Sequence, residues 1–225
     1  MAPIVHSKIA PQPAFDHSAE ANVSRMPVWI RQSLAQGEYA ATAGHVHNNS
    51  LHTVCESARC PNRGECWSSG TATFMLLGDI CTRACGFCAV KTGRPLPVDF
   101  DEPRRIAKAA EDMGVKYLVL TSVNRDELAD GGASIFAETL KQLYQLNPEL
   151  GLELLTPDFR NCQAEAVELL ARALPESKSW VWGHNVETVP SLYQQVRKGS
   201  RYQRSLDLLK QSSELSNVET KSSLM

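Results

Sequence analysis

The spacing of the cysteines constrains this chain more than any other feature of its sequence. Six of its seven cysteines form two triplets, namely Cys55, Cys60 and Cys66 followed by Cys81, Cys85 and Cys88. In a reducing compartment thiolates bind metals or carry out redox chemistry, and structural disulfides are rare. The clusters therefore indicate a chemical role and not a packing role.

Three kinds of thiol chemistry compete for such clusters. We expect no disulfide loops of a secreted domain, because no signal peptide precedes the clusters and each triplet leaves an odd thiol. Structural zinc favours four ligands in paired Cys-x2-Cys knuckles, which neither triplet forms. A 4Fe-4S cube usually takes four protein ligands, so a loop with only three leaves one iron open. The spacing Cys81-x3-Cys85-x2-Cys88 therefore predicts a catalytic iron–sulfur cluster, with one irregular zinc site as the alternative.

This second triplet, with Phe87 before its last cysteine, resembles the signature of radical S-adenosylmethionine enzymes. The first triplet, in the segment from Cys55 to Cys66, resembles the auxiliary-cluster motif of the lipoyl synthase family. Further segments similar to that family are Gly70–Met75, Thr121–Asp126, Asp130–Gly132, Pro157–Phe159 and His184–Val189. The resemblance spans about residues 26–225, nearly the whole chain.

Composition agrees with a globular domain. The 225 residues are 43% hydrophobic and 21% charged, which suffices for one domain with a sizeable core. The formal net charge of −2 predicts no nucleic-acid partner and no membrane-surface role, and no apolar run approaches a membrane span. Residues 1–25 are expected to form a flexible N-terminal arm. Its single arginine, beside Asp16 and Glu20, disfavours a transit peptide and favours a cytoplasmic protein.

Strand and helix patterns alternate along the rest of the chain. Strands are expected near Thr73, Leu118, Leu154, Val181 and Lys221. Helices are expected at about 101–113, 136–143, 167–174, 188–196 and 202–215, the last with Leu206 and Leu209 inward. Upstream we expect a short helix over 27–36, then a hydrophilic connector with solvated His45, His47 and His52. The alternation implies an α/β fold with a parallel sheet.

The resemblance sharpens this to a partial (βα) barrel of the radical SAM type. The family has six strand–helix units; about five are expected here, over residues 71–225, after an N-terminal extension, residues 26–70, with the auxiliary motif. The family's final segment carries an Arg-Ser-Ser-Tyr motif, in which a serine is the fourth ligand of the auxiliary cluster. This chain has no such motif. We therefore expect a C-terminally incomplete chain whose auxiliary cluster lacks its serine ligand.

The resemblance also implies a reaction with two 4Fe-4S clusters and S-adenosylmethionine. Two sulfur atoms would be inserted into the octanoyl group of lipoyl carrier domains, as in 2-oxo acid dehydrogenase complexes and the glycine-cleavage H protein, with a reduced electron donor. Cys81, Cys85 and Cys88 would hold the catalytic cluster, and Cys55, Cys60 and Cys66 the cluster that supplies sulfur. Six residues match family positions near the S-adenosylmethionine pocket: Phe87, Ser122, Asn124, Asn185, Glu187 and Arg197.

Plainer roles compete with these. Ser122 would cap a helix, Glu187 would end one, and Arg197 would be a surface charge instead of a bidentate partner for a carboxylate. At the level of the whole chain, three hypotheses stay open. The first is an active lipoyl synthase, the second is a truncated non-catalytic or regulatory relative with one 4Fe-4S cluster, and the third is a zinc-binding module.

Overall fold

The structure, a computed structural model, describes residues 36–58, 60–68 and 71–225. The predicted arm over residues 1–25 lies outside these residues, as does nearly all of the helix predicted over 27–36. The elements in chain order are α1 Gln36–Asn48, α2 Val54–Ser57, α3 Arg63–Ser68, β1 Thr71–Leu76, β2 Ile80–Cys81, β3 Lys91–Thr92, α4 Glu102–Asp112, β4 Tyr117–Ser122, α5 Ala133–Leu146, β5 Gly151–Leu155, α6 Gln163–Ala171, β6 Trp180–Gly183, a 3-10 turn η1 Pro190–Leu192, α7 Tyr193–Val196, α8 Tyr202–Ser213 and β7 Val218–Lys221.

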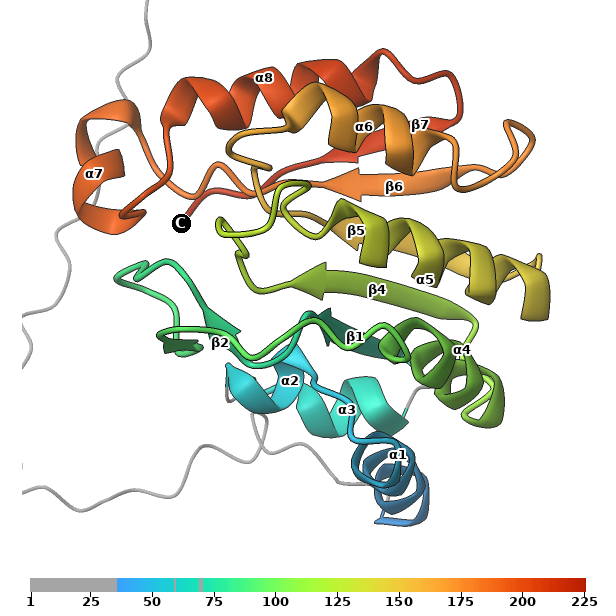
Figure 1. Ribbon diagram of the computed structural model, residues 1–225. Coiled ribbons are helices and arrows are strands. Elements are labelled where there is room, and N and C mark those ends of the chain that lie inside the picture. Colours follow the sequence, from blue (N-terminus) through green and yellow to red (C-terminus); the bar gives the residue numbers. More distant parts are fainter. Residues whose placement is uncertain (1–35, 59, 69–70) are drawn as a thin grey trace, which may run out of the picture. The chain divides into compact units, whose positions relative to one another are not determined.

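The predicted parallel sheet is confirmed. Its five strands stand in the order β1-β4-β5-β6-β7, and every neighbouring pair is parallel. The helices between them pack in the same sequence, α4 against α5, α5 against α6 and α6 against α8 (Figure 1). Strands β2 and β3 form a separate two-stranded parallel sheet that the sequence pattern does not predict. In the described part of the chain, no helix is both long and apolar enough to cross a membrane.

One row across the sheet forms the centre of the core. Phe74, Leu120, Leu154 and Trp182 are register partners on β1, β4, β5 and β6, and each is fully buried. Successive residues of a strand point to opposite faces of a sheet. The next row, with Met75, Thr121 and Leu155, therefore faces the other side, where these three residues line a cavity. This pleat separates the apolar core from the candidate site.

Local sequence explains the helices that cover the sheet. Asp101 stands at the N-cap of α4 and Pro103 lies in its first turn, as predicted. Gly114 follows that helix with a φ of +59°, a left-handed conformation that glycine adopts without strain. In α5 the predicted face is buried, and the helix ends at Asn147, before Pro148.

Two predictions about helices are wrong. The inner face of α8 consists of Ser205, Leu208 and Ser212, whereas the predicted Leu206 and Leu209 are only half-buried. An apolar pattern cannot find this face, because two of its three members are serines whose hydroxyls are satisfied inside the protein.

The predicted connector after residue 36 is largely helical, as α1. Tertiary contacts stabilise this helix, since Tyr39 stacks on Trp67 with ring centroids 5.3 Å apart and Val46 is fully buried. His47 bonds to Glu56 at 3.0 Å.

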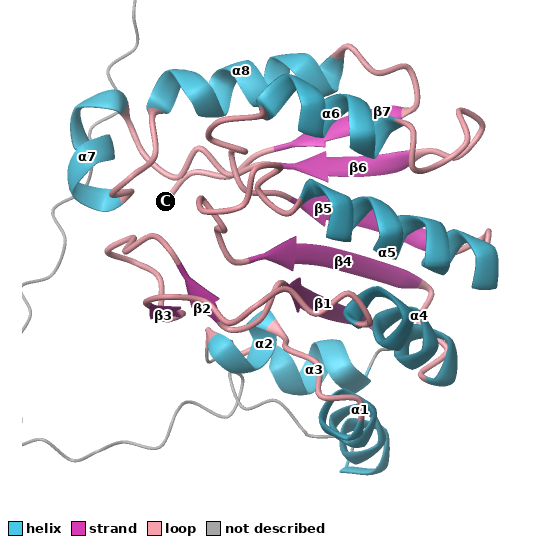
Figure 2. Ribbon diagram, in the orientation of Figure 1, coloured by secondary structure: helices cyan, strands magenta, loops and turns pink. Residues whose placement is uncertain are grey.

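The N-terminal extension covers the free edge of β1. The Met75 amide donates to the His52 carbonyl at 2.8 Å, and Thr53 forms an antiparallel bridge with Phe74. Figure 2 shows α2 and α3 beside β1, with the β2–β3 pair beyond the end of that strand. The extension therefore brings the first cysteine triplet next to the sheet.

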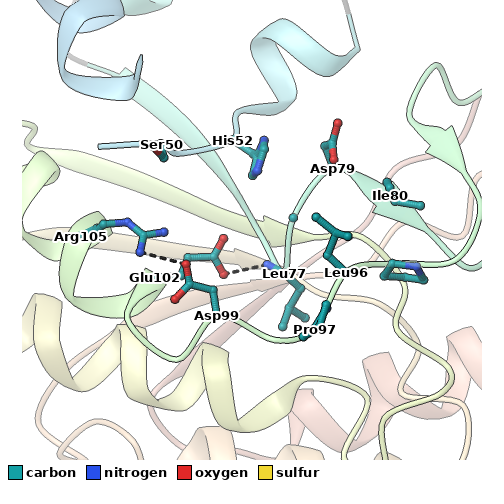
Figure 3. Close-up of a pocket in the computed structure, with 12 residues that line it drawn as sticks. Ser50, His52, Leu77, Asp79, Ile80, Leu96, Pro97, Asp99, Glu102 and Arg105 are labelled. Atoms are coloured by element: carbon teal, nitrogen blue, oxygen red, sulfur yellow. Dashed lines mark hydrogen bonds and ion pairs between the residues drawn. The ribbon is translucent and has the colours of Figure 1, made fainter. Parts of the chain in front are cut away.

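A strained turn joins β1 to the second triplet. Leu77 and Gly78 have positive φ of +69° and +90°. The buried Glu102 carboxylate accepts a hydrogen bond from the Leu77 amide at 2.8 Å, and Arg125 donates to the Leu77 carbonyl at 3.1 Å. Figure 3 shows Glu102 pointing at Leu77 in a small pocket beside Asp99 and Arg105. The turn is thus held from both sides before the chain enters β2.

We expect Gly132→Ala to destabilise the fold by about 2–4 kcal/mol, from left-handed strain and overpacking. Gly132 has a φ of +89°, and a Cβ there would lie 2.2 Å from Cδ1 of Leu77. Gly114→Ala is the control, because Gly114 shares the left-handed φ but has open space around it. Urea unfolding of both variants isolates the clash. Equal losses in the two variants would show that the contact with Leu77 is unimportant.

Candidate active site

A cavity of about 330 Å³ lies at the carboxyl ends of the strands, where parallel α/β proteins place their chemistry. It is called the main pocket below. Every residue predicted for the catalytic cluster or the S-adenosylmethionine site lines it: Cys81, Cys85, Phe87, Cys88, Ser122, Asn124, Asn185, Glu187 and Arg197. Figure 2 shows the arrowheads of the strands pointing toward this side, where α7 and the β2–β3 pair also lie.

The sulfur of Cys81 is surrounded by N–H donors. It accepts from the backbone amides of Arg83 at 3.4 Å and Asn124 at 3.3 Å, and the Asn124 side-chain amide lies 3.8 Å away. Three N–H groups from two separate loops therefore converge on this sulfur and hold it at the pocket wall.

The other two thiols of the triplet stand on a loop pinned to α7. The Gly86 amide donates to the Val196 carbonyl at 2.9 Å, and the Cys88 amide donates to the Cys85 carbonyl at 3.2 Å. Burial raises the pKa of the Cys85 thiol, and the positive charge of Arg197 opposes that rise. The three thiols are free cysteines on one pocket wall, so their chemistry fits a three-cysteine iron–sulfur cluster.

Within residues 36–58, 60–68 and 71–225, no three His, Cys, Asp or Glu side chains are grouped as ligands of one metal ion would be.

The cluster loop is anchored by a buried ion network that the sequence reasoning missed. Arg83 donates two hydrogen bonds to Asp126, at 2.7 and 2.6 Å, one to Asp158 at 2.6 Å and one to Ser200 at 2.9 Å. Arg204 completes the network through Asp158 at 3.1 Å. Burial alone would lower the pKa of Arg83, but the two carboxylates outweigh it and raise that pKa.

The same network lowers the pKa of one carboxyl group. Burial would raise the pKa of Asp158, yet Arg83 holds it below its usual range. The motifs that contain Asp126 and Asp158 were recognised in the sequence, but pattern alone does not tell that both carboxylates meet the arginine between Cys81 and Cys85.

The remaining predicted residues contact the pocket in different ways. The Ser122 hydroxyl is buried and makes no hydrogen bond in the described part of the chain, and it caps no helix. Glu187 has a φ of +70°, held by hydrogen bonds with Ser223 and Met225. Phe87 is 45% exposed at the pocket rim. Arg197 is buried, so the surface-charge alternative is wrong.

The first triplet adjoins the same pocket. Cys55 is buried on α2, and its helix neighbours Val54 and Ala58 line the main pocket. The Cys60 amide donates a hydrogen bond to the Cys55 carbonyl at 3.1 Å. Burial raises the pKa values of Cys55 and Cys66, and Cys60 adds to the rise at both thiols. The residues that flank Cys55 and the three thiols of the second triplet thus line one cavity.

Replacing Arg83 by lysine keeps the charge but removes the fork that binds two carboxylates. We expect Arg83→Lys to cost about 2–4 kcal/mol of folding stability, because Asp126 and Asp158 lose buried hydrogen bonds. Urea unfolding measures the loss. Arg104→Lys, which alters an exposed pair with Asp101, is the control and should change nothing measurable. Equal stability of the two variants would contradict this role.

The pH dependence of stability should report His184, whose pKa is lowered to about 4 by burial and by Arg197. The unfolded chain takes up a proton below about pH 6.5 and the folded chain only near 4, so stability falls as pH drops through this window. The loss reaches about 3 kcal/mol. The free energy of unfolding, measured with urea between pH 7.5 and 4.5, should therefore fall more steeply with decreasing pH in the wild type than in His184→Gln. Parallel curves would contradict the assignment.

Comparisons with known proteins agree with this site. The model of the radical SAM superfamily matches residues 75–225. The chain is 51% identical to the lipoyl synthase of Alcanivorax borkumensis, covering 92% of this chain and 63% of that protein. The lipoyl synthase of Koribacter versatilis is 48% identical over 88% of this chain and 64% of its own. The lipoyl synthase of Symbiobacterium thermophilum is 47% identical, and the match covers 95% of this chain and 66% of that protein.

The chain thus spans a little under two thirds of the length of these relatives. Among solved structures, the crystal structure of methylornithine synthase has a TM-score of 0.49 at 12% identity, covering 81% of this chain and 48% of that one. The family match covers most of the sheet and the whole second triplet, and it agrees with the three-thiol pocket at the carboxyl ends of a parallel sheet. The chain belongs to the radical SAM superfamily and is similar over most of its length to lipoyl synthases.

Proposed function

We propose that the chain carries out the lipoyl synthase reaction, the insertion of two sulfur atoms into a protein-bound octanoyl group. One observation carries the proposal: a single cavity is lined by the three thiols of the radical SAM motif and by Val54 and Ala58, which flank Cys55, the first cysteine of the auxiliary motif. A substrate between two such clusters would lie within reach of both. The similarity to lipoyl synthases supports the same reaction.

In this proposal Cys81, Cys85 and Cys88 hold a 4Fe-4S cluster, and Cys55, Cys60 and Cys66 hold the second. When bound, the first cluster supplies the electron that cleaves the sulfonium of S-adenosylmethionine to a carbon radical, and the second supplies sulfur. Such chemistry removes hydrogen from unactivated carbon, which no acid or base can do. The protein's task is to bind, orient and exclude water.

The polar part of the main pocket suits the amino-acid portion of S-adenosylmethionine. Arg197 offers a guanidinium for its carboxylate, and Glu187 offers a carboxylate for its ammonium group. Ser122, Asn124 and Asn185 add neutral donors and acceptors. We assign Phe87, at the rim, to contact with the adenine ring.

The apolar part suits a fatty acyl chain. The apolar side chains Val54, Met75, Val90 and Leu155 line the pocket. These side chains would bind an octanoyl group and keep water from the reacting carbons. The acyl group would arrive on a lysine of a lipoyl carrier domain, as in 2-oxo acid dehydrogenase complexes or the glycine-cleavage H protein. A reduced electron donor and a cytoplasmic location complete the proposal.

Anaerobic reconstitution tests the proposal. We expect about eight irons per chain, the content of two four-iron cubes. With S-adenosylmethionine and a reductant, the protein should form 5′-deoxyadenosine, and an octanoyl-lysine peptide should gain sulfur. Both products are measured by mass spectrometry.

Cysteine variants separate the two clusters. Cys85→Ala should reduce deoxyadenosine to background, whereas Cys60→Ala should keep it and lose only the sulfur product. Cys162→Ala is the matched control, because Cys162 is a free thiol outside both triplets. About four irons, with deoxyadenosine but no sulfur product, would indicate a truncated relative that binds one 4Fe-4S cluster and lacks sulfur insertion. Full loading without deoxyadenosine would overturn the proposal.

A further inference from the structure

A chain of buried hydrogen bonds connects the segments that follow β5 and β6 with α7 and α8, and two of its members, Thr156 and His184, line the main pocket. His184 Nδ1 lies 2.8 Å from the Thr156 carbonyl, and its Nε2 lies 2.9 Å from the Ser205 hydroxyl. The Tyr193 hydroxyl lies 2.6 Å from Ser205, and Arg197 NH1 donates to Tyr193 at 2.8 Å. We call His184, Ser205 and Tyr193 the buried tether. All three side chains are at least 98% buried.

The proton positions in the tether follow from its ends. The Thr156 carbonyl can only accept, so His184 Nδ1 carries the proton and Nε2 accepts. The Ser205 hydroxyl therefore donates to His184, and its oxygen accepts from Tyr193. The Tyr193 oxygen in turn accepts from Arg197, which can only donate. Every hydrogen bond in the tether thus has one direction, from the arginine toward the carbonyl.

The tether engages only one end of the Arg197 guanidinium. NH1 donates to the Asn185 carbonyl at 2.6 Å, to Tyr193 at 2.8 Å and to Ser205 at 3.3 Å. The buried Nε makes no hydrogen bond, and in the described residues no carboxylate lies within ion-pair distance of Arg197. Arg83 is also buried, but by contrast it bonds two carboxylates.

This imbalance points to a ligand. A buried guanidinium without a counter-charge is costly, and an anion in the adjoining cavity would remove that cost. Arg197 lines the main pocket, and its guanidinium carbon lies 5.5 Å from the centre of the Tyr193 ring. A guanidinium binds a planar carboxylate through two parallel hydrogen bonds.

We propose that His184, Ser205 and Tyr193 are positioning residues that hold Arg197 for a carboxylate ligand and so set the preference of the pocket for that ligand. The inference rests on the proposed function, in which the carboxylate belongs to S-adenosylmethionine. None of the three positioning residues needs to touch the ligand's carboxylate, since they act through the arginine. Their loss should weaken recognition of the carboxylate and leave recognition of the rest of the ligand intact.

The test compares binding of S-adenosylmethionine with binding of its decarboxylated analogue to the reconstituted, iron-loaded protein by equilibrium dialysis. The readout is the ratio of the two affinities. Ser205→Ala and Tyr193→Phe each remove one hydroxyl and should lower this ratio about tenfold, the value of a lost hydrogen bond. Arg197→Lys should lower it at least as far. The affinity for the decarboxylated analogue should stay near the wild-type value in all three variants.

Matched controls come from the same elements. Ser212→Ala removes the other buried serine on the inner face of α8, and Tyr202→Phe removes the hydroxyl of the ring that packs edge-on against Tyr193. Both should keep the wild-type ratio. Thermal melts and iron content show whether each variant is folded and loaded.

The outcomes separate the two proposals. A ratio that falls in Arg197→Lys but stays at the wild-type value in Ser205→Ala and Tyr193→Phe overturns the tether alone. A wild-type protein with no preference for the carboxylate overturns both the tether and the proposed role of Arg197. Ratios lowered in all three variants and unchanged in both controls confirm the inference.

Discussion

The buried ion network around Arg83 is the interaction on which the rest of the site depends. Arg83 and Asp158 are buried there, Asp126 and Arg204 are partly buried, and these charges are stable because each guanidinium meets a carboxylate in good geometry. The network joins the cysteine loop to the ends of β4 and β5 and to the turn before α8. The second triplet is therefore placed by three loops that are distant in sequence, and its exposed cysteine loop is rigid at its base.

Two buried arginines serve opposite purposes beside this pocket. Arg83 has its hydrogen bonds filled by Asp126, Asp158 and Ser200, so it has a structural task. Arg197 has no carboxylate partner in the described part of the chain and retains an unbonded Nε. The physical difference is that the charge of Arg83 is compensated by carboxylates and the charge of Arg197 is not. Arg83 therefore stabilises loops, whereas Arg197 is available to bind a ligand.

The N-terminal extension does more than cover a sheet edge. By pairing residues 52 and 53 with β1, it brings α2 to the cavity that the second triplet also borders. The strand pleat then decides which side chains enter that cavity, since Met75, Thr121 and Leu155 face it while their neighbours fill the core. The position of this cavity and its lining thus follow from one edge contact and one row of the sheet.

The sequence by itself determined the parallel sheet, the order of strands and helices, and the cysteines and six polar or aromatic residues that line the pocket. These follow from local spacing and from motifs. Only the tertiary structure decided the pairing of Arg83 with Asp126 and Asp158, the serine-lined face of α8, the helical α1 and the tether behind Arg197. Each of these features depends on a partner that is distant along the chain. The periodicity of a sequence predicts buried apolar faces, but it does not predict which polar side chains will pair.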